Sequence, residues 1–127
     1  MTENELARIV VDIAYQIHTR LGPGLLESVY EAIMLYELRK RCLTAEKQFG
    51  VPVIWDDIKL DIGFRADIIV EGKLILELKS CEAIDPVHKK QLLTYLRLAD
   101  CRLGLLINFN VPLIKDGISR VVNNLPE

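Results

Sequence analysis

Two acidic residues and a lysine stand on either side of a short turn. Asp67 precedes the turn Glu71-Gly72-Lys73, and Glu77 and Lys79 follow it. Carboxylate oxygens bind hard divalent cations such as Mg²⁺ or Mn²⁺, and such a cation stabilises charge on a phosphoryl group and lowers the pKa of an attacking water. A neighbouring lysine orients that water or neutralises developing negative charge. These residue types therefore indicate metal-assisted hydrolysis, if the fold brings them together.

Apolar residues on both sides of the turn predict two strands joined as a hairpin, because they recur at every second position. The even positions hold Leu60, Ile62, Phe64, Ala66, Ile68 and Val70, and then Leu74, Leu76 and Leu78. For both sets to share one face, paired residues must have an even sum, which requires an odd-length loop or a bulge at Glu71-Gly72. Asp67, Glu77 and Lys79 then share the other face. The alternative is an ordinary surface ion pair between Glu77 and Lys79, worth ~0 to 1 kcal/mol.

The N-terminal third of the chain predicts two helices. Thr2 and Glu5 form a capping-box pattern, and helical apolar spacing follows to Ile17, which predicts a helix over residues 3–20. Gly22-Pro23-Gly24 ends it, and a second helix follows to about residue 40.

The remaining segments complete the predicted sheet. A strand is expected from about residue 45 to the turn at 56–57, a third helix from Asp85-Pro86 to about residue 100, and a buried strand over 103–109. Residues 111–122 suit either an edge strand or a short helix. We therefore expect one α/β or α+β domain over residues 1–127, in the order ααβββαβ, with a mixed sheet flanked by helices.

Composition narrows the functional classes. The 127 residues include 16 Lys and Arg, 18 Asp and Glu, three cysteines and 50% hydrophobic residues, with a net charge of −2. No apolar run approaches the roughly 18 residues of a membrane span, and the acidic N-terminus lacks a signal-peptide pattern, so we expect a cytoplasmic protein without membrane contact. The acidic balance argues against a broad basic surface but allows a local basic groove. The high apolar share is compatible with a homodimer.

The residues around the hairpin also resemble a known motif. Asp67 followed by Glu77-Leu78-Lys79 is similar to the motif of the PD-(D/E)xK nuclease superfamily, with Ala66 where the motif name has proline. Gly24-Leu25-Leu26-Glu27-Ser28-Val29-Tyr30 matches the G-x-x-E-x-x-Y signature of the GxxExxY family of small bacterial and archaeal proteins, which residues 104–109 also resemble. The resemblance covers nearly the whole chain. It implies a restriction-endonuclease-like core, a Mg²⁺ or Mn²⁺ cofactor and a nucleic-acid substrate, DNA rather than RNA.

The resemblance also implies roles for residues outside the hairpin. In related nucleases a glutamate on the helix before the sheet approaches the metal, directly or through water, and Glu27 occupies the matching position; the helix dipole alone also favours an acid there. Gln91-x-x-x-Tyr95 resembles the Q-x-x-x-Y element of the RecB-like branch, which lies beside the active site. The implied metal ligands are thus Asp67, Glu77 and Glu27. Lys79 would position the water, and Gln91 and Tyr95 would support the substrate.

Two further residues are candidates for substrate contact by position. His88 shares a helix face with Gln91 and Tyr95, and suits a metal or a phosphate, although a histidine on a helix surface is usually only solvated. Arg65 precedes Asp67 by two positions on the same strand face. The resulting hypothesis is a divalent-metal-dependent nuclease acting on DNA. The alternatives are a binding or assembly module that keeps the nuclease fold without turnover and, more weakly, hydrolysis of a small phosphoester.

Overall fold

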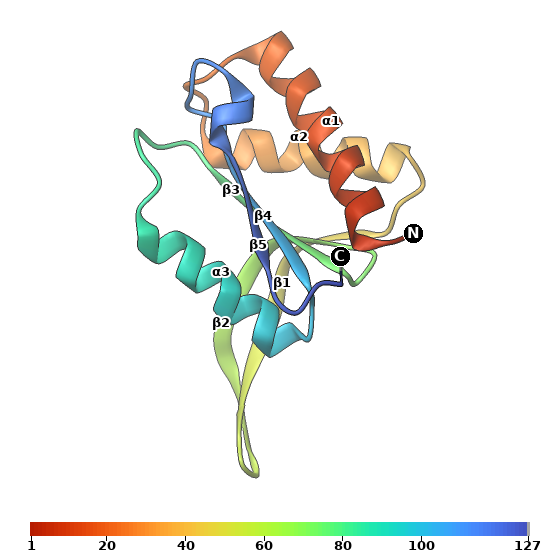
Figure 1. Ribbon diagram of the computed structural model, residues 1–127, viewed down its shortest axis with the longest axis vertical. Coiled ribbons are helices and arrows are strands. Elements are labelled where there is room, and N and C mark those ends of the chain that lie inside the picture. Colours follow the sequence, from red (N-terminus) through yellow and green to blue (C-terminus); the bar gives the residue numbers. More distant parts are fainter. Residues whose placement is uncertain (127) are drawn as a thin grey trace.

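Five strands form one mixed sheet with helices on both faces, as the computed structural model of residues 1–126 shows (Figure 1). The predictions included the side chain of Ile62, as one of the alternating apolar residues, and Glu127, as the end of the domain. Both lie outside what the structure describes. The elements in chain order are α1 (Glu3–Leu21), α2 (Glu27–Lys40), β1 (Ala45–Trp55), β2 (Ile58–Val70), β3 (Leu74–Lys79), α3 (Pro86–Ala99), β4 (Leu103–Asn108), the 3-10 helix η1 (Ile114–Gly117) and β5 (Ile118–Val122). The fold class is confirmed.

The sheet order follows the chain order, β1-β2-β3-β4-β5. Only β3 and β4 pair in parallel, because α3 connects them as a crossover, and all other neighbours are antiparallel. The C-terminal segment, for which the sequence allowed an edge strand or a helix, contains both, since η1 leads into the edge strand β5.

The hairpin between β2 and β3 has the predicted register. Val70 pairs with Leu74 and Ile68 with Leu76, so the pair sums are even, and the loop between them has three residues. Glu71 and Gly72 both adopt positive φ angles, 53° and 63°, which closes this odd-length loop. Gly72 takes up this conformation without steric cost.

Both faces of the sheet are buried, which places its centre in a dry environment. The face with Ile68 and Leu76 packs under α1 and α2, and the face with Ile69 and Ile75 packs under α3. Each fully buried apolar side chain contributes roughly 1.5–3 kcal/mol. A polar residue on the α3 side of β3 is therefore removed from water as well.

The distal end of the β1–β2 hairpin extends away from this body, at the bottom of Figure 1. We call residues 53–60 the arm. A bulge between Val51 and Val53 separates the arm from the paired residues nearer the core, and its tip side chains are exposed. None of the helices in residues 1–126 has the length and apolar character needed to cross a membrane.

Candidate active site

Asp67 and Glu77 complete the hydrogen bonding between β2 and β3 at the point where the two strands separate. Backbone pairing ends at Ile68 and Leu76, so the next opposed pair in this register is Asp67 and Glu77. The Leu78 N–H donates to Asp67 Oδ2 at 2.8 Å, and the Asp67 N–H donates to Glu77 Oε1 at 3.2 Å. These two bonds fix both carboxyl groups on the backbone of the opposite strand.

The pairing of Asp67 with its other neighbouring strand is also interrupted. Lys47 pairs with Ile68 and Phe49 with Ala66, but the residue between them, Gln48, adopts a positive φ of 50° and does not pair with Asp67. A positive φ is uncommon for a residue with a side chain. Asp67 therefore lies in a local opening of the sheet, where it is half-buried and lines a surface cavity.

Burial raises the pKa of both carboxyl groups. Glu77 is only 8% exposed. Its pKa rises to about 8, mainly because of burial and secondly because of the negative charge on Asp67. Burial also raises the pKa of Asp67, and the charges of Glu31 and Glu27 add to this, whereas the Leu78 N–H and Lys79 oppose it. Two adjacent carboxylates here need a positive charge to be stable as anions.

Lys79 supplies part of that positive charge. It is the last residue of β3, and its ammonium group lowers the pKa of both Asp67 and Glu77. Among the described residues it forms no ion pair within 4.0 Å. Lys79 is thus close enough to act on the site and still has its hydrogen-bond donors available.

The loop before α2 brings Glu27 to the same region. Glu27 is the first residue of α2, and its Oε1 accepts a hydrogen bond from the Ser80 N–H at 3.4 Å, directly after Lys79. The Ser80 hydroxyl donates to the Leu25 carbonyl at 2.6 Å, which joins this loop to the end of β3. Glu27 therefore lies beside the Asp67 and Glu77 pair, at the mouth of the opening.

Tyr30 anchors the same loop. Its hydroxyl donates to the Gly22 carbonyl at 2.6 Å and accepts from the Leu25 N–H at 3.2 Å, and its ring stacks on Phe109 at a centroid distance of 4.2 Å. Gly24 has a φ of 97°, which a side chain would strain. The G-x-x-E-x-x-Y spacing thus combines a glycine turn, the acidic residue and the tyrosine that holds the turn in place.

Replacing Tyr30 with Phe tests this anchor. We expect the free energy of unfolding to fall by about 1–2 kcal/mol, because the stacked ring remains while the Gly22 carbonyl and Leu25 N–H lose their partner. Urea denaturation measures the change. Tyr36→Phe, at an exposed position of the same helix, serves as the control. Equal denaturation midpoints for the two variants would exclude an anchoring role.

Two residues beside the acids, Glu31 and Gln48, were not predicted from the sequence. Both carboxylate oxygens of Glu31 accept from Gln48 Nε2, at 3.2 and 3.3 Å. The charge of Glu31 raises the pKa of Asp67 more strongly than the charge of Glu27 does. A surface cavity is lined by both residues together with Glu27, Asp67 and Ser80. The spacing of Glu27 and Glu31, one helical turn, was an available signal for a shared face. Gln48 offered none, because its place depends on how β1 pairs with β2.

Tyr95 of α3 is buried close enough to the acids for their charges to act on it. Only 6% of it is exposed, and its pKa is raised by burial and by the charges of Glu77 and Asp67. Its ring packs against the ring of Phe64, with the two ring centroids 4.9 Å apart. Gln91, one turn earlier, is exposed.

The two basic candidates differ in how much of their hydrogen-bonding capacity is free. Arg65 is exposed, and its Nη1 donates to the Gln48 carbonyl at 3.5 Å. His88 completes the capping box of α3, where its Nδ1 accepts from the Asp85 N–H at 3.3 Å. This structural bond uses one ring nitrogen and leaves Nε2 for other contacts.

The residues present fit a divalent cation. One oxygen of Asp67 and one of Glu77 accept backbone N–H groups, which leaves the second oxygen of each carboxyl for a metal. Within residues 1–126, no three His, Cys, Asp or Glu side chains are gathered closely enough to hold an ion without adjustment. Two opposed, mutually repelling carboxyls, one buried and one half-buried, are nevertheless a donor set that Mg²⁺ or Mn²⁺ takes with several waters.

Comparison with known proteins agrees with this geometry. A family model described as the PD-(D/E)XK nuclease superfamily matches residues 4–121, a range that covers every helix and strand except the first residue of α1 and the last residue of β5. Searches of curated proteins and of solved structures found no significant match. Because the family model spans well over half of the chain, the protein belongs to the PD-(D/E)XK nuclease superfamily.

Proposed function

We propose that this protein is a divalent-metal-dependent nuclease that hydrolyses phosphodiester bonds in DNA, and that it belongs to the GxxExxY family within its superfamily. The observation that carries the proposal is the pair of opposed carboxyls, the half-buried Asp67 and the buried Glu77, whose pKa values Lys79 lowers. The positive φ of Gly24, the hydrogen bond between Glu27 and Ser80, and the anchoring of the loop by Tyr30 support the family assignment.

In this proposal each residue has a distinct role. Asp67 and Glu77 would hold the cation, with Glu27 as an additional carboxylate, and the cation would supply Lewis-acid stabilisation of the phosphoryl group and activation of water. Lys79 orients the attacking water for in-line displacement and stabilises the negative charge that develops on phosphorus. Tyr95 positions Glu77 from the α3 side.

Exposed polar side chains provide the substrate contacts of the proposal. Arg65 donates to the carbonyl of Gln48 beside the site, and Gln91, Lys89 and Lys90 are exposed on the first turns of α3. Each phosphate contact from such a cation adds a salt-dependent contribution to affinity. The choice of DNA rests on the family resemblance. A cytoplasmic location remains a prediction.

Metal binding provides the most direct test of the site. We expect calorimetry to detect Mn²⁺ binding to the wild-type protein, and Asp67→Asn and Glu77→Gln to weaken it by at least the ~10–100-fold that loss of an outer-shell partner costs. Affinity should rise with pH up to about 8, because the bound ion displaces a proton from Glu77. The control is Glu46→Gln, an exposed acid of β1.

The absence of Mn²⁺ binding at every pH would instead favour the non-catalytic alternative, a nucleic-acid-binding or assembly module. The net charge of −2 and the lack of a preformed three-ligand cluster in the described chain are the observations behind that alternative. Cleavage assays with single-stranded DNA, double-stranded DNA, RNA and a small phosphodiester, each with Mg²⁺, Mn²⁺ or EDTA, separate the substrate classes. Turnover of the small ester alone would contradict a nuclease.

A further inference from the structure

The arm carries exposed apolar side chains that have no role in the proposed site. Trp55, the only tryptophan of the chain, is 71% exposed, and its neighbours Ile54 and Ile58 are 65% and 56% exposed. Trp55 lies four residues beyond the buried Val51, or about 13 Å along an extended strand. Apolar surface concentrated at the end of a hairpin typically marks an interaction site.

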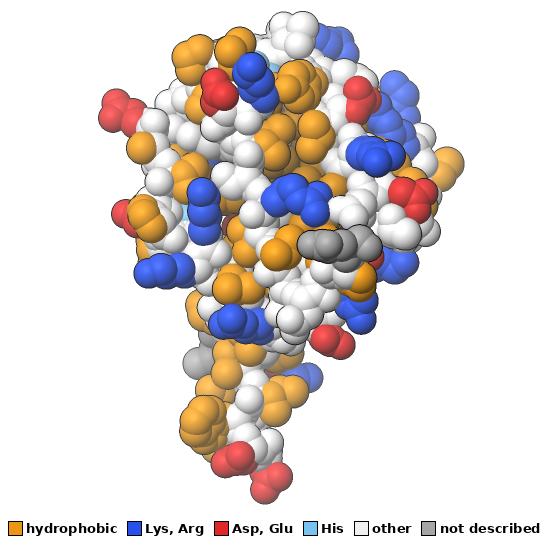
Figure 2. Space-filling model, in the orientation of Figure 1, with side chains coloured by type: hydrophobic (Ala, Val, Ile, Leu, Met, Phe, Trp, Pro, Cys, Tyr) orange, Lys and Arg blue, Asp and Glu red, His pale blue; other side chains and the backbone are white. Residues whose placement is uncertain are grey.

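The turn of the arm is acidic. Asp56 and Asp57 connect β1 to β2, and neither forms an ion pair with any described residue. Figure 2 shows the acidic side chains at the extreme end of the arm, next to its hydrophobic side chains. Two unpaired carboxylates repel phosphates, so the tip is unsuited to a nucleic-acid backbone and suited to a positively charged protein surface.

A second surface of the same chain has the complementary character. We call it the groove; about 920 Å³ in volume, it lies between α1 and β5. Apolar side chains line its floor, namely Ala7, Val11, Tyr15, Leu105 and Ile118. Arg8, Lys115 and Arg120 border it, and none of them forms an ion pair within the described part of the chain.

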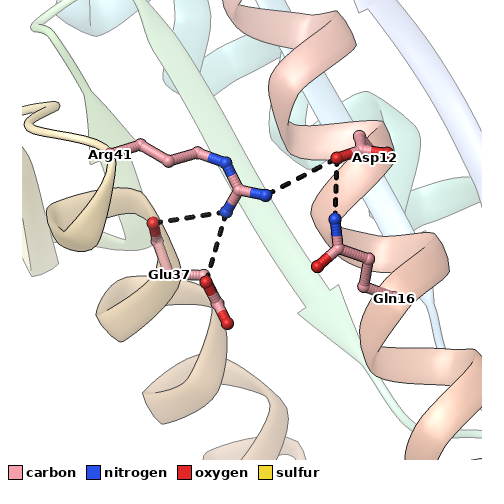
Figure 3. Close-up of polar contacts among 4 residues, drawn as sticks. All are labelled: Asp12, Gln16, Glu37 and Arg41. Carbon is pink, nitrogen blue, oxygen red and sulfur yellow. Dashed lines mark hydrogen bonds and ion pairs between the residues drawn. The ribbon is translucent and has the colours of Figure 1, made fainter.

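The single acidic residue lining the groove already has a cationic partner, whereas the three basic residues have no anionic partner among the described residues. Asp12 Oδ2 lies 3.5 Å from Arg41 Nη2 and accepts from Gln16 Nε2 at 2.9 Å (Figure 3). Arg41 also pairs with Glu37 at 3.3 Å, so this network links α1 to α2. The charge that the groove presents to a partner is therefore positive.

We propose that the arm of one copy of this chain seats in the groove of a second copy, and that the exchange is reciprocal. Trp55 then covers the apolar floor, while Asp56 and Asp57 face Arg8 and Arg120. A buried aromatic side chain contributes only about 150–250 Å², and specific interfaces bury about 1,200–2,000 Å² in total. Two reciprocal contacts related by a two-fold axis are therefore favoured over a single one. This inference is independent of the proposed catalysis.

Sedimentation and tryptophan fluorescence test the dimer. We expect the wild-type protein to shift from monomer to dimer with increasing concentration, and the emission of Trp55 to move to shorter wavelength over the same range. A monomer throughout, with unchanged emission, would overturn the proposal. An emission shift that requires added DNA would overturn it as well.

Charge exchange tests the pairing of the two surfaces. The arm variant Asp56→Lys/Asp57→Lys and the groove variant Arg8→Asp/Arg120→Asp should each weaken dimerisation by about 100-fold, because like charges then face each other. An equimolar mixture should form a heterodimer, since both of its contacts pair opposite charges.

A matched control separates this effect from net charge. Glu46→Lys/Glu82→Lys makes the same charge change as the arm variant on exposed side chains outside both surfaces, and should dimerise like the wild type. Wild-type dimerisation by both reversed variants, or failure of their mixture to associate when each is folded by circular dichroism, would show that the arm and groove do not form the interface.

Discussion

Asp67→Asn is expected to reduce metal-dependent cleavage of DNA by roughly 10²–10³-fold or more, the size of effect seen when one preorganised electrostatic group is lost. The variant retains an amide oxygen that accepts the Leu78 N–H, so the contact between β2 and β3 survives while the charge is removed. Lys79→Ala is expected to cause a loss of similar size, because the ammonium group that acts on both carboxyls is gone. Initial rates with Mg²⁺ or Mn²⁺ measure both effects.

Two controls isolate the site from general damage. Asp61→Asn makes the same chemical change on β2 at an exposed position, where the carboxylate pairs only with Lys59 at 3.7 Å. Lys73→Ala removes a lysine at the opposite end of β3, where its ammonium contacts the Met1 carbonyl. Both should cleave at the wild-type rate. Full activity in Asp67→Asn and Lys79→Ala would rule out this group of residues as the catalytic centre.

The metal-free protein is expected to become less stable as the pH rises from about 5 to 9. The Glu77 carboxyl has a pKa of about 8 in the folded chain, against an ordinary value of 4.5. Between these values the folded state binds more protons than the unfolded state, so the free energy of unfolding falls with pH, by at most ~1.4 kcal/mol per pH unit. The loss is complete above the folded pKa and amounts to a few kcal/mol.

Glu77→Gln should remove most of this dependence. The amide still accepts the Asp67 N–H but does not ionise, so the variant should exceed the wild type in stability at pH 9 and match it near pH 5. Added Mn²⁺ should restore the stability of the wild type at high pH and act little on the variant. Urea denaturation across this pH range gives the comparison, with Glu46→Gln as the control. The same slope in Glu77→Gln and the wild type would contradict this origin of the effect.

The opposition of Asp67 and Glu77 followed from the sequence because strand periodicity is simple. Alternating apolar residues on both sides of a three-residue loop allow only one register with a common buried face, and that register opposes these two acids. The place of Tyr95 came from the resemblance to the Q-x-x-x-Y element and not from periodicity, and in the structure α3 covers the sheet face that α1 and α2 leave free. The local sequence pattern was sufficient to predict a side chain's position within a single element or a tight hairpin.

Other positions depend on how separate elements pack. Glu31 acts on Asp67 because of the placement of α2 over the sheet, and Gln48 reaches Glu31 because β1 departs from regular pairing at a positive φ. Neither condition leaves a periodic signal. His88 shows the opposite case: the Asp85-x-x-His88 spacing contained a local capping interaction, which is present in the structure, while its part in substrate binding is still a prediction.

The hydrogen bonds that Asp67 and Glu77 accept have a consequence for sequence drift. Each carboxyl satisfies a backbone N–H at the point where two central strands separate, so both positions require an oxygen acceptor even if no reaction takes place. A related chain without hydrolytic activity would therefore keep Asn or Gln at these two sites rather than Ala or Val. Amides at the two positions would then mark where the acids stood even in an inactive relative.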